Sequence, residues 1–366
     1  MYLYIIFGFI SLLAFSELNL GRKFGKIAVI PIVFIFFLLS FLRWERGTDW
    51  SAYKSIFENI ATNEYLQMMY EFLFMKLNII IHSISGDYTL MLFCQACIIY
   101  FCYLIILRKY SASPILSVAV WLSLSLGSIF FTRQAIAISI CLLSFHFIFK
   151  RKVYYFLLTV FLAMLFHQTA FIFLPAYWIY KLNLSRKQMI LILIGSFVLT
   201  FAAQSLLSLV ASSSLGSISE RGTAYTESGS EENFGSAYSP METMVRGLVY
   251  RIGLIAILMT YFYDLYRKDQ FFRGFYNLFF VSIILFILFV PISVALIRFA
   301  GYYEIFQIFL FPVLLLYTKD NIYRNCILLL ILLYLGFKFN GVITGYEDLY
   351  IPYKSIFNKE LQVEIG

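Results

Sequence analysis

Long apolar runs recur along almost the whole chain, and short polar stretches separate them. A helix needs about 20 predominantly apolar residues to cross the hydrocarbon core of a bilayer. The pattern therefore predicts an all-α polytopic membrane protein with about twelve transmembrane helices. The predicted spans cover residues 2–18, 27–42, 88–107, 112–131, 134–149, 153–167, 169–181, 188–208, 243–263, 275–296, 302–317 and 324–337.

Two parts of this pattern need a separate interpretation. The stretch 64–84 is apolar but carries three charged side chains, so we expect it to be interfacial or re-entrant. The runs 153–167 and 169–181 are each short for a crossing, and we expect them to form a helical hairpin with His167 near its outer tip. One long tilted helix in their place would reverse the side of every later loop and break the charge pattern described below.

We expect a single transmembrane domain over residues 1–366 with three polar parts on its outer side. These are an interfacial segment at 43–87, a polar loop at 211–241 and a C-terminal tail at 338–366. The loop is rich in Ser, Gly and Glu. It is either a linker or a lid over an outward-facing site.

Composition supports the membrane class and removes several others. Apolar residues make up 61% of the chain and charged residues 13%, which excludes an ordinary soluble protein. The formal net charge of +8 is distributed over short loops, so it reports membrane topology and not a basic face for nucleic acid. All five cysteines lie in apolar runs, and we expect neither a disulfide framework nor a metal site.

The distribution of basic residues predicts the orientation. If the N-terminus lies outside, every short cytoplasmic loop is basic, as the positive-inside rule requires. These loops lie around residues 22–26, 108–109, 150–152, 181–187, 267–273 and 319–324.

A group of arginines then falls at the outer ends of the spans, where that rule disfavours cations. The guanidinium fork matches multi-oxygen anions, so a lipid-linked diphosphate is the ligand we expect for the group. Each arginine taken alone could instead be a cation that snorkels to the interface. The group consists of Arg43, Arg133, Arg246, Arg251 and Arg298.

The densest outer polar cluster follows the second span and contains Arg43, Arg46 and Asp49. Aromatic and apolar residues at helical spacing come next, and they predict an amphipathic surface helix whose aromatic face lies among lipid headgroups. Asp49 is either the N-cap of that helix, an acid or base, or a group that orients an arginine. The predicted face consists of Trp50, Tyr53, Ile56 and Phe57.

His167 stands among apolar residues at the predicted hairpin tip. It is either a hydrogen-bonded structural residue or a base that accepts a proton from a sugar hydroxyl. Glu304 is the main acidic residue near the start of a span.

Five motifs occur in order along nearly the whole chain. They are R-W-E-R-G-T-D-W-x-x-Y-x-x-x-F from Arg43 to Phe57, T-R-Q-A-I-A-I-S-I from Thr132 to Ile140, F-H-Q-T-A-F-I-F-L-P from Phe166 to Pro175, R-F-A-G-Y-Y-E-I-F from Arg298 to Phe306, and Y-I-P-Y-K-S-I-F from Tyr350 to Phe357. Together they resemble the EpsG branch of the Wzy-type bacterial polysaccharide polymerases. Trp50 stands where that family commonly has a tyrosine.

This resemblance implies a metal-independent glycosyltransferase without a cofactor, with a glycosyltransferase C-like fold. It implies action at the outer face of the bacterial cytoplasmic (inner) membrane. There the growing glycan would pass from undecaprenyl diphosphate to a sugar hydroxyl of a new lipid-linked repeat unit. Donor and acceptor lipids are the implied partners, with a chain-length regulator and a flippase of the same pathway. Whether the product is O-antigen, capsule or exopolysaccharide stays open.

The same resemblance implies roles for individual residues. The outer arginines would bind the diphosphate and stabilise the charge that develops on the leaving group. We rank His167 ahead of Asp49 and Glu304 as the residue that takes the acceptor's proton. The alternatives are an O-antigen-ligase-type glycosyltransferase, a lipid-linked oligosaccharide flippase and a non-enzymatic assembly component. The expected substrate-binding set is Arg43, Arg46, Arg133, Gln134, Arg246, Arg251, Arg298 and Tyr302.

Overall fold

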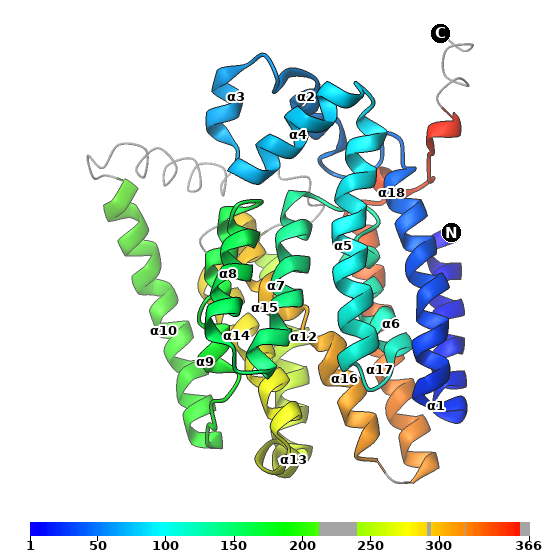
Figure 1. Ribbon diagram of the computed structural model, residues 1–366. Coiled ribbons are helices and arrows are strands. Elements are labelled where there is room, and N and C mark those ends of the chain that lie inside the picture. Colours follow the sequence, from blue (N-terminus) through cyan, green and yellow to red (C-terminus); the bar gives the residue numbers. More distant parts are fainter. Residues whose placement is uncertain (212–239, 291–293, 319, 359–366) are drawn as a thin grey trace. The chain divides into compact units, whose positions relative to one another are not determined.

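The structure is a computed structural model that describes residues 1–211, 240–290, 294–318 and 320–358. All regular elements in these ranges are helices, which confirms the predicted all-α class (Figure 1). The chain divides into two compact units, which are described one at a time. Unit 1 comprises Met1–Leu174 and Gln307–Gly366, and unit 2 comprises Pro175–Phe306.

Unit 1 contains eleven of the described α-helices and three short 3-10 helices. The α-helices are α1 (Tyr2–Phe41), α2 (Trp50–Asn59), α3 (Glu64–Met69), α4 (Phe72–Ile84), α5 (Tyr88–Tyr110), α6 (Pro114–Ser125), α7 (Arg133–Phe149), α8 (Val153–Met164), α16 (Gln307–Leu316), α17 (Asn321–Thr344) and α18 (Glu347–Tyr350). The 3-10 helices are η1 (Leu126–Ser128), η2 (Gln168–Phe173) and η4 (Ile356–Asn358).

The first helix is a hairpin and not one continuous rod (Figure 1). Gly21 has φ 80° and ψ 173°, a backbone conformation that only glycine adopts easily, and it interrupts the helical geometry. Both ends of α1 meet Tyr353, because the Tyr2 ring lies 5.7 Å from its ring and Leu39 O accepts its hydroxyl at 2.9 Å. The two predicted spans at 2–18 and 27–42 are therefore the two arms of this hairpin.

The core of unit 1 forms around α6, which packs against α1, α16 and α17. Its residues from Pro114 to Ser123 are all buried, as expected of a helix that is apolar on every side. Trp121 is at its centre and stacks on Tyr103 with 3.8 Å between ring centroids. The N-terminus of α6 is satisfied by Glu17 of α1, whose Oε2 accepts Ile115 N–H at 3.0 Å and the Ser113 hydroxyl at 2.5 Å.

Unit 1 has two distinct ends along α5. At one end Tyr88 packs edge-on against Trp50, and at the other Lys109 O accepts from Arg22 Nη2 at 3.0 Å. Arg43 lies at the Tyr88 end, because the adjacent Trp44 packs against Trp50 at 4.8 Å. Arg43 also bonds the carbonyls of Ile129 and Phe131, next to the start of α7. Within unit 1 the structure thus separates the predicted outer arginines from the predicted inner basic loops.

The predicted surface helix is present as α2, but its aromatic face has a different partner. Trp50 and Phe57 are buried, and Phe57 lies 5.6 Å from the ring of Tyr88 on α5. Tyr53 contacts Phe74 of α4 at 5.9 Å. The expectation that this face lies among lipid headgroups is wrong, because α4 and α5 cover it.

The chain reverses at His167, as predicted. Phe173 of η2 comes back to within 6.1 Å of Phe156 on α8. After the reversal the chain forms the 3-10 helix η2 and then α9 (Ala176–Ile179). Each of these two helices is shorter than the single helix predicted for residues 169–181.

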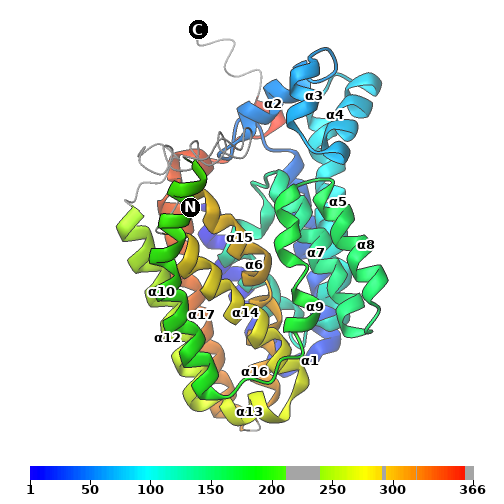
Figure 2. The same cartoon turned by 90° about the vertical axis from the view of Figure 1, so that its left-hand side faces the viewer.

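Unit 2 is arranged around α14 (Gln270–Phe289), with α10 (Arg186–Ala211) and α12 (Pro240–Tyr261) packed against it (Figure 2). It also contains α9, α13 (Tyr263–Lys268), η3 (Val294–Ile297) and α15 (Arg298–Glu304). Two predicted inner loops meet here, because Arg267 Nη1 donates to Asn183 Oδ1 at 3.0 Å.

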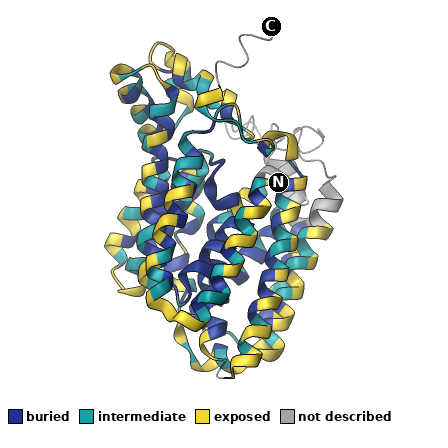
Figure 3. Ribbon diagram, turned by 90° about the vertical axis from the view of Figure 1, so that its right-hand side faces the viewer, coloured by how far each residue is buried: buried dark blue, intermediate teal, exposed yellow. Residues whose placement is uncertain are grey.

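Five helices in the described ranges are long and apolar enough to cross a membrane, which makes this a multi-pass membrane protein by its fold. Buried and exposed residues alternate along single helices (Figure 3). Twelve crossings and the glycosyltransferase C-like fold stay predictions.

The helix α17 continues to Thr344, so the predicted tail at 338–366 begins later than expected. The predicted loop at 211–241 lies almost wholly outside the described residues. The five helices long and apolar enough to cross a membrane are Tyr2–Phe41, Tyr88–Tyr110, Gln270–Phe289, Arg298–Leu316 and Asn321–Thr344.

Candidate functional site

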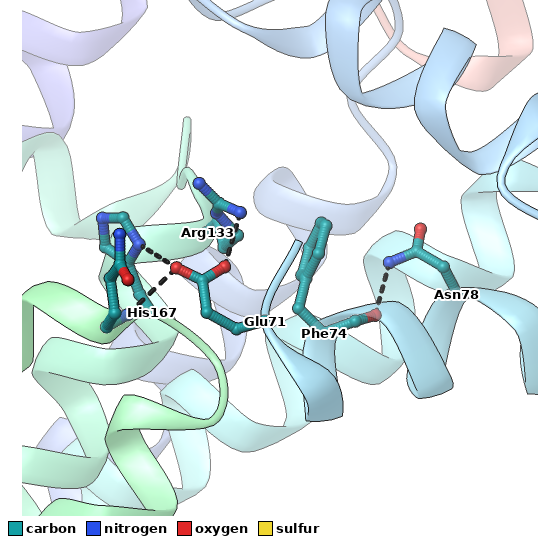
Figure 4. A network of polar contacts seen from close by, with 6 residues as sticks. Glu71, Phe74, Asn78, Arg133 and His167 are labelled. Carbon is teal, nitrogen blue, oxygen red and sulfur yellow. Dashed lines mark hydrogen bonds and ion pairs between the residues drawn. The ribbon is translucent and has the colours of Figure 1, made fainter. Parts of the chain in front are cut away.

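Glu71 is the centre of a polar cluster in unit 1 (Figure 4). Its Oε2 accepts from Arg133 Nη1 at 2.6 Å, and its Oε1 lies 3.1 Å from His167 Nδ1. The same Oε1 accepts from Gln168 N at 3.0 Å. We call Glu71, Arg133 and His167 the Glu71 site.

Three chain reversals bring these residues together. Glu71 has an extended backbone (ψ 146°) between α3 and α4, which interrupts helical structure and directs its side chain away from both helices' own turns. Arg133 is the first residue of α7, and His167 directly precedes η2. The backbone holds the arrangement, because Leu73 N donates to Leu165 O at 2.9 Å across the site.

Glu71 is a carboxylate in this environment. Burial alone would raise its pKa, but the hydrogen bond from His167 and the charge of Arg133 outweigh burial, so its pKa is lowered from the usual value. An ionised carboxylate can only accept hydrogen bonds. His167 Nδ1 must therefore be the protonated nitrogen that donates to it.

This assignment determines which nitrogen of the imidazole can interact with a ligand. When a neutral histidine donates through Nδ1, its Nε2 carries the lone pair and can accept a proton. A carboxylate on Nδ1 also holds the ring in one orientation and stabilises the imidazolium that forms after proton uptake. The Glu71 site therefore has the elements of a general base with its orienting group.

Arg133 is held between this carboxylate and two aromatic rings. Its guanidinium carbon lies 4.8 Å from the centroid of Tyr70 and 5.4 Å from that of Phe74. The side chain is 17% exposed. Glu71 uses one of the five N–H donors of the guanidinium, and its Nε is buried without an acceptor. Gln134 follows it in the first turn of α7 and is half-buried.

Arg43 lies at the same end of unit 1 but is committed to the backbone. It is 3% exposed, donates to Ile129 O at 2.6 Å and Phe131 O at 3.0 Å, and lies over the Phe131 ring at 4.3 Å. These contacts join the start of the 43–87 segment to the entry of α7.

The neighbouring polar residues contact the C-terminal tail. Arg46 Nη1 donates to Asp348 O at 2.9 Å, and Gly47 N donates to Leu349 O at 3.0 Å. Gly47 has φ 106°, where a side chain would be strained. Asp49 occupies the N-cap position of α2, but its side chain makes no capping hydrogen bond there.

In unit 2 a second arginine and carboxylate pair is formed by Arg251 and Glu304. Arg251 Nη2 donates to Glu304 Oε2 at 2.8 Å, with 10% and 15% of the side chains exposed. The guanidinium lies 3.8 Å from the ring centroid of Phe286. Glu304, a candidate base in the sequence analysis, is thus paired with one of the predicted outer arginines.

The other predicted residues of unit 2 are near this pair in the chain. Arg246 is exposed and lies on α12, the helix of Arg251. Arg298 is exposed at the first position of α15, and Tyr302 is buried in the same helix.

The predicted residues therefore fall into two groups, one in each unit. The Glu71 site unites Arg133 and His167, and the second group contains Arg251 and Glu304. Within the ranges that the structure covers, no three His, Cys, Asp or Glu side chains lie close enough to hold a metal ion. Metal independence itself stays a prediction.

Sequence analysis missed Glu71, which links the two best candidates of unit 1. A signal for it was present, because an acidic residue inside an apolar stretch requires a partner that offsets its desolvation. The same reasoning was applied to the arginines but not to this carboxylate.

The fold defines a multi-pass, all-helical membrane protein with an arginine and a histidine on a shared carboxylate. The chain belongs to the EpsG family, whose match covers residues 26–355. No curated protein and no solved structure matches it. Membership of the EpsG family implies a glycosyltransferase-type polysaccharide polymerase.

Proposed function

We propose that this protein polymerises lipid-linked polysaccharide repeat units at the outer face of the cytoplasmic membrane. The growing glycan leaves undecaprenyl diphosphate and joins a sugar hydroxyl of a new repeat unit that is itself lipid-linked. The observation that supports this most directly is the Glu71 site, because it places a cation for a diphosphate beside a base for a hydroxyl.

The reaction balances with the groups of this site. The bond between the anomeric carbon and the diphosphate oxygen breaks, and the electron pair leaves with the diphosphate. The acceptor hydroxyl oxygen forms the new bond to the same carbon and releases its proton to His167 Nε2. Arg133 stabilises the negative charge on the leaving diphosphate through N–H donors that Glu71 does not use.

Glu71 is the positioning residue in this mechanism. Its carboxylate bonds both the imidazole and the guanidinium, so it sets the distance between the proton acceptor and the anion-binding group. Gln168 N–H fixes the same oxygen, which limits rotation of the carboxylate. Because these groups are already in position before the reaction starts, they reorganise less on the way to the transition state.

The remaining arginines differ in their suitability as substrate contacts. Arg43 is buried and bonded to carbonyl oxygens, so we propose a structural role for it. Arg246 and Arg298 in unit 2 are exposed and stay proposed contacts to the diphosphate or glycan. Tyr302 was expected in the same role but is buried, so we propose a structural role for it as for Arg43. The pair of Arg251 and Glu304 has the same chemistry as Arg133 and Glu71, and we propose it as a second anion-binding group.

The test is the size distribution of the surface glycan on a gel, in a strain that lacks this protein and carries one of several variants. Arg133→Lys should replace the polymer ladder by single repeat units, because an ammonium cannot make the bidentate contact. We expect a rate loss on the order of 100-fold, typical for a lost transition-state donor. Arg324→Lys is the matched control, since the Arg324 side chain donates to Asn321 Oδ1 at the start of α17, away from the Glu71 site.

The other outcomes reject the proposal in defined ways. A normal ladder in Arg133→Lys, with the protein inserted at wild-type level, removes the diphosphate role of Arg133. Long chains that stay on their lipid carrier in the null strain indicate a ligase. Absence of any repeat unit at the outer face indicates a flippase.

A further inference from the structure

A groove opens on the surface of unit 1 between α1 and α5, with a volume of about 370 Å³. This volume lies in the range of small-molecule sites. Three cations and three apolar side chains line it: Lys26, Phe101, Leu104, Ile105, Arg108 and Lys109.

The groove has an apolar part and a cationic part in a fixed order. Five of its residues come from α5 at positions i, i+3, i+4, i+7 and i+8, so they form one stripe on that helix. Phe101 begins the stripe and Arg108 follows about 10 Å further along the axis, at 1.5 Å per residue. Lys26 of α1 lines the same groove from the facing helix.

The cations of the groove have no acidic partner in the parts of the chain that the structure covers. None of the ion pairs found there includes Lys26, Arg108 or Lys109. The carboxylate of the nearby α1 arm, Glu17, is buried and bonded to the start of α6. The positive charge of the groove is therefore available to an external anion.

We propose that this groove binds one anionic phospholipid. The headgroup phosphate lies between Lys26, Arg108 and Lys109, and an acyl chain follows Leu104 and Ile105 to Phe101, which is 64% exposed. Basic pockets between membrane helices suit anionic headgroups, and the apolar stripe below matches an acyl chain. A soluble anion would gain nothing from that stripe.

The groove is distinct from the Glu71 site. Arg133 is the first residue of α7 and Phe149 the last, and the Phe149 ring lies 5.6 Å from that of Tyr110 at the end of α5. Seventeen residues of helix separate the two ends by about 25 Å. A lipid in the groove therefore does not take part in the transfer reaction. It fixes the arm of α1 that carries Lys26 against α5.

Native mass spectrometry of the full-length protein in detergent tests whether the groove binds an anionic phospholipid. The protein is titrated with phosphatidylglycerol or with phosphatidylcholine, and the bound lipid is measured. The wild type should retain one phosphatidylglycerol and at least tenfold less phosphatidylcholine. Lys26→Gln/Arg108→Gln should weaken retention by roughly 30-fold, since each basic residue contributes about 1 kcal/mol. The control is Lys150→Gln/Lys152→Gln, which removes equal charge from the next basic loop outside the groove.

Leu104→Trp supplies an independent variant, because it fills the apolar part and keeps all three cations. It should also lose the bound lipid. Equal losses in the two Lys/Arg double variants would show diffuse attraction and overturn the proposal, as would equal retention of both lipids. Displacement of phosphatidylglycerol by an equimolar polyprenyl diphosphate would overturn the phospholipid assignment.

Discussion

At the scale of single residues, the Glu71 site shows how one carboxylate gives two other side chains their properties. Glu71 accepts from Arg133 and His167, which lie 62 and 96 positions away in the sequence. Loop charges predicted that Arg133 and His167 lie on one side of the membrane, and the structure brings the two side chains together. Their common partner could not be predicted, because helical periodicity carries no information on contacts between distant segments.

The lowered pKa of Glu71 predicts a specific pH dependence of stability. A carboxyl whose folded-state pKa lies below its usual value of 4.5 stabilises the fold above that pH. This contribution should disappear as the pH falls through the lowered folded-state pKa. We therefore expect Glu71→Gln to lower the melting temperature at pH 7, and the difference from the wild type to shrink as the pH falls below 4.5.

Thermal unfolding in detergent at a series of pH values measures this difference. Glu64→Gln on the exposed side of α3 is the control and should follow the wild type throughout. A gap between wild type and Glu71→Gln that is constant with pH would contradict the assignment of an ionised carboxylate.

At the scale of elements, the positions of helices could be predicted from hydropathy, and each predicted span does contain helical structure. The packing of faces was less predictable, as α2 shows. Amphipathicity defines an apolar face but not whether lipid or protein covers it. A break between the predicted spans 2–18 and 27–42 is confirmed, because the basic residues Arg22 and Lys23 interrupt the apolar pattern there; the structure places it at Gly21.

Helix α6 depends on the Glu17 side chain of α1, which accepts hydrogen bonds at its N-terminus. Removing this cap should destabilise unit 1. Glu17→Ala leaves the Ile115 N–H and the Ser113 hydroxyl buried without their acceptor. The cost of such unsatisfied groups is about 1–3 kcal/mol, so the melting temperature should fall by several degrees. Ser16→Ala is the neighbouring control, because its exposed hydroxyl bonds only Leu12 O. Equal melting temperatures for the two variants would show that the cap is dispensable.

At the scale of the whole molecule, residues 42–47 and 349–356, which are about 300 positions apart in the sequence, meet in unit 1. Trp44 N donates to Lys354 O at 2.9 Å, and Ile356 N donates to Leu42 O at 2.9 Å. Tyr353 contacts both arms of α1. No pattern in the sequence predicted this junction, because the tail was expected to be an outer extension.

A chain that ends at Gly345 should therefore lose order at its beginning. We expect faster amide hydrogen exchange over residues 42–49 and a lower melting temperature, because three backbone hydrogen bonds to this segment are absent. A chain that ends at Asn358 keeps all three bonds and serves as the control. Unchanged exchange in the shorter chain would show that the junction adds no stability.

This junction has a consequence for biosynthesis. Residues 42–47 emerge early from the ribosome, but their partners around residue 354 follow about 300 residues later. At a translation rate of about 5–20 residues per second, the delay is roughly 15–60 s. During this time the first hairpin is already in the membrane with unpaired backbone groups beside it. Synthesis of residues 349–356 is therefore the event that closes this end of unit 1.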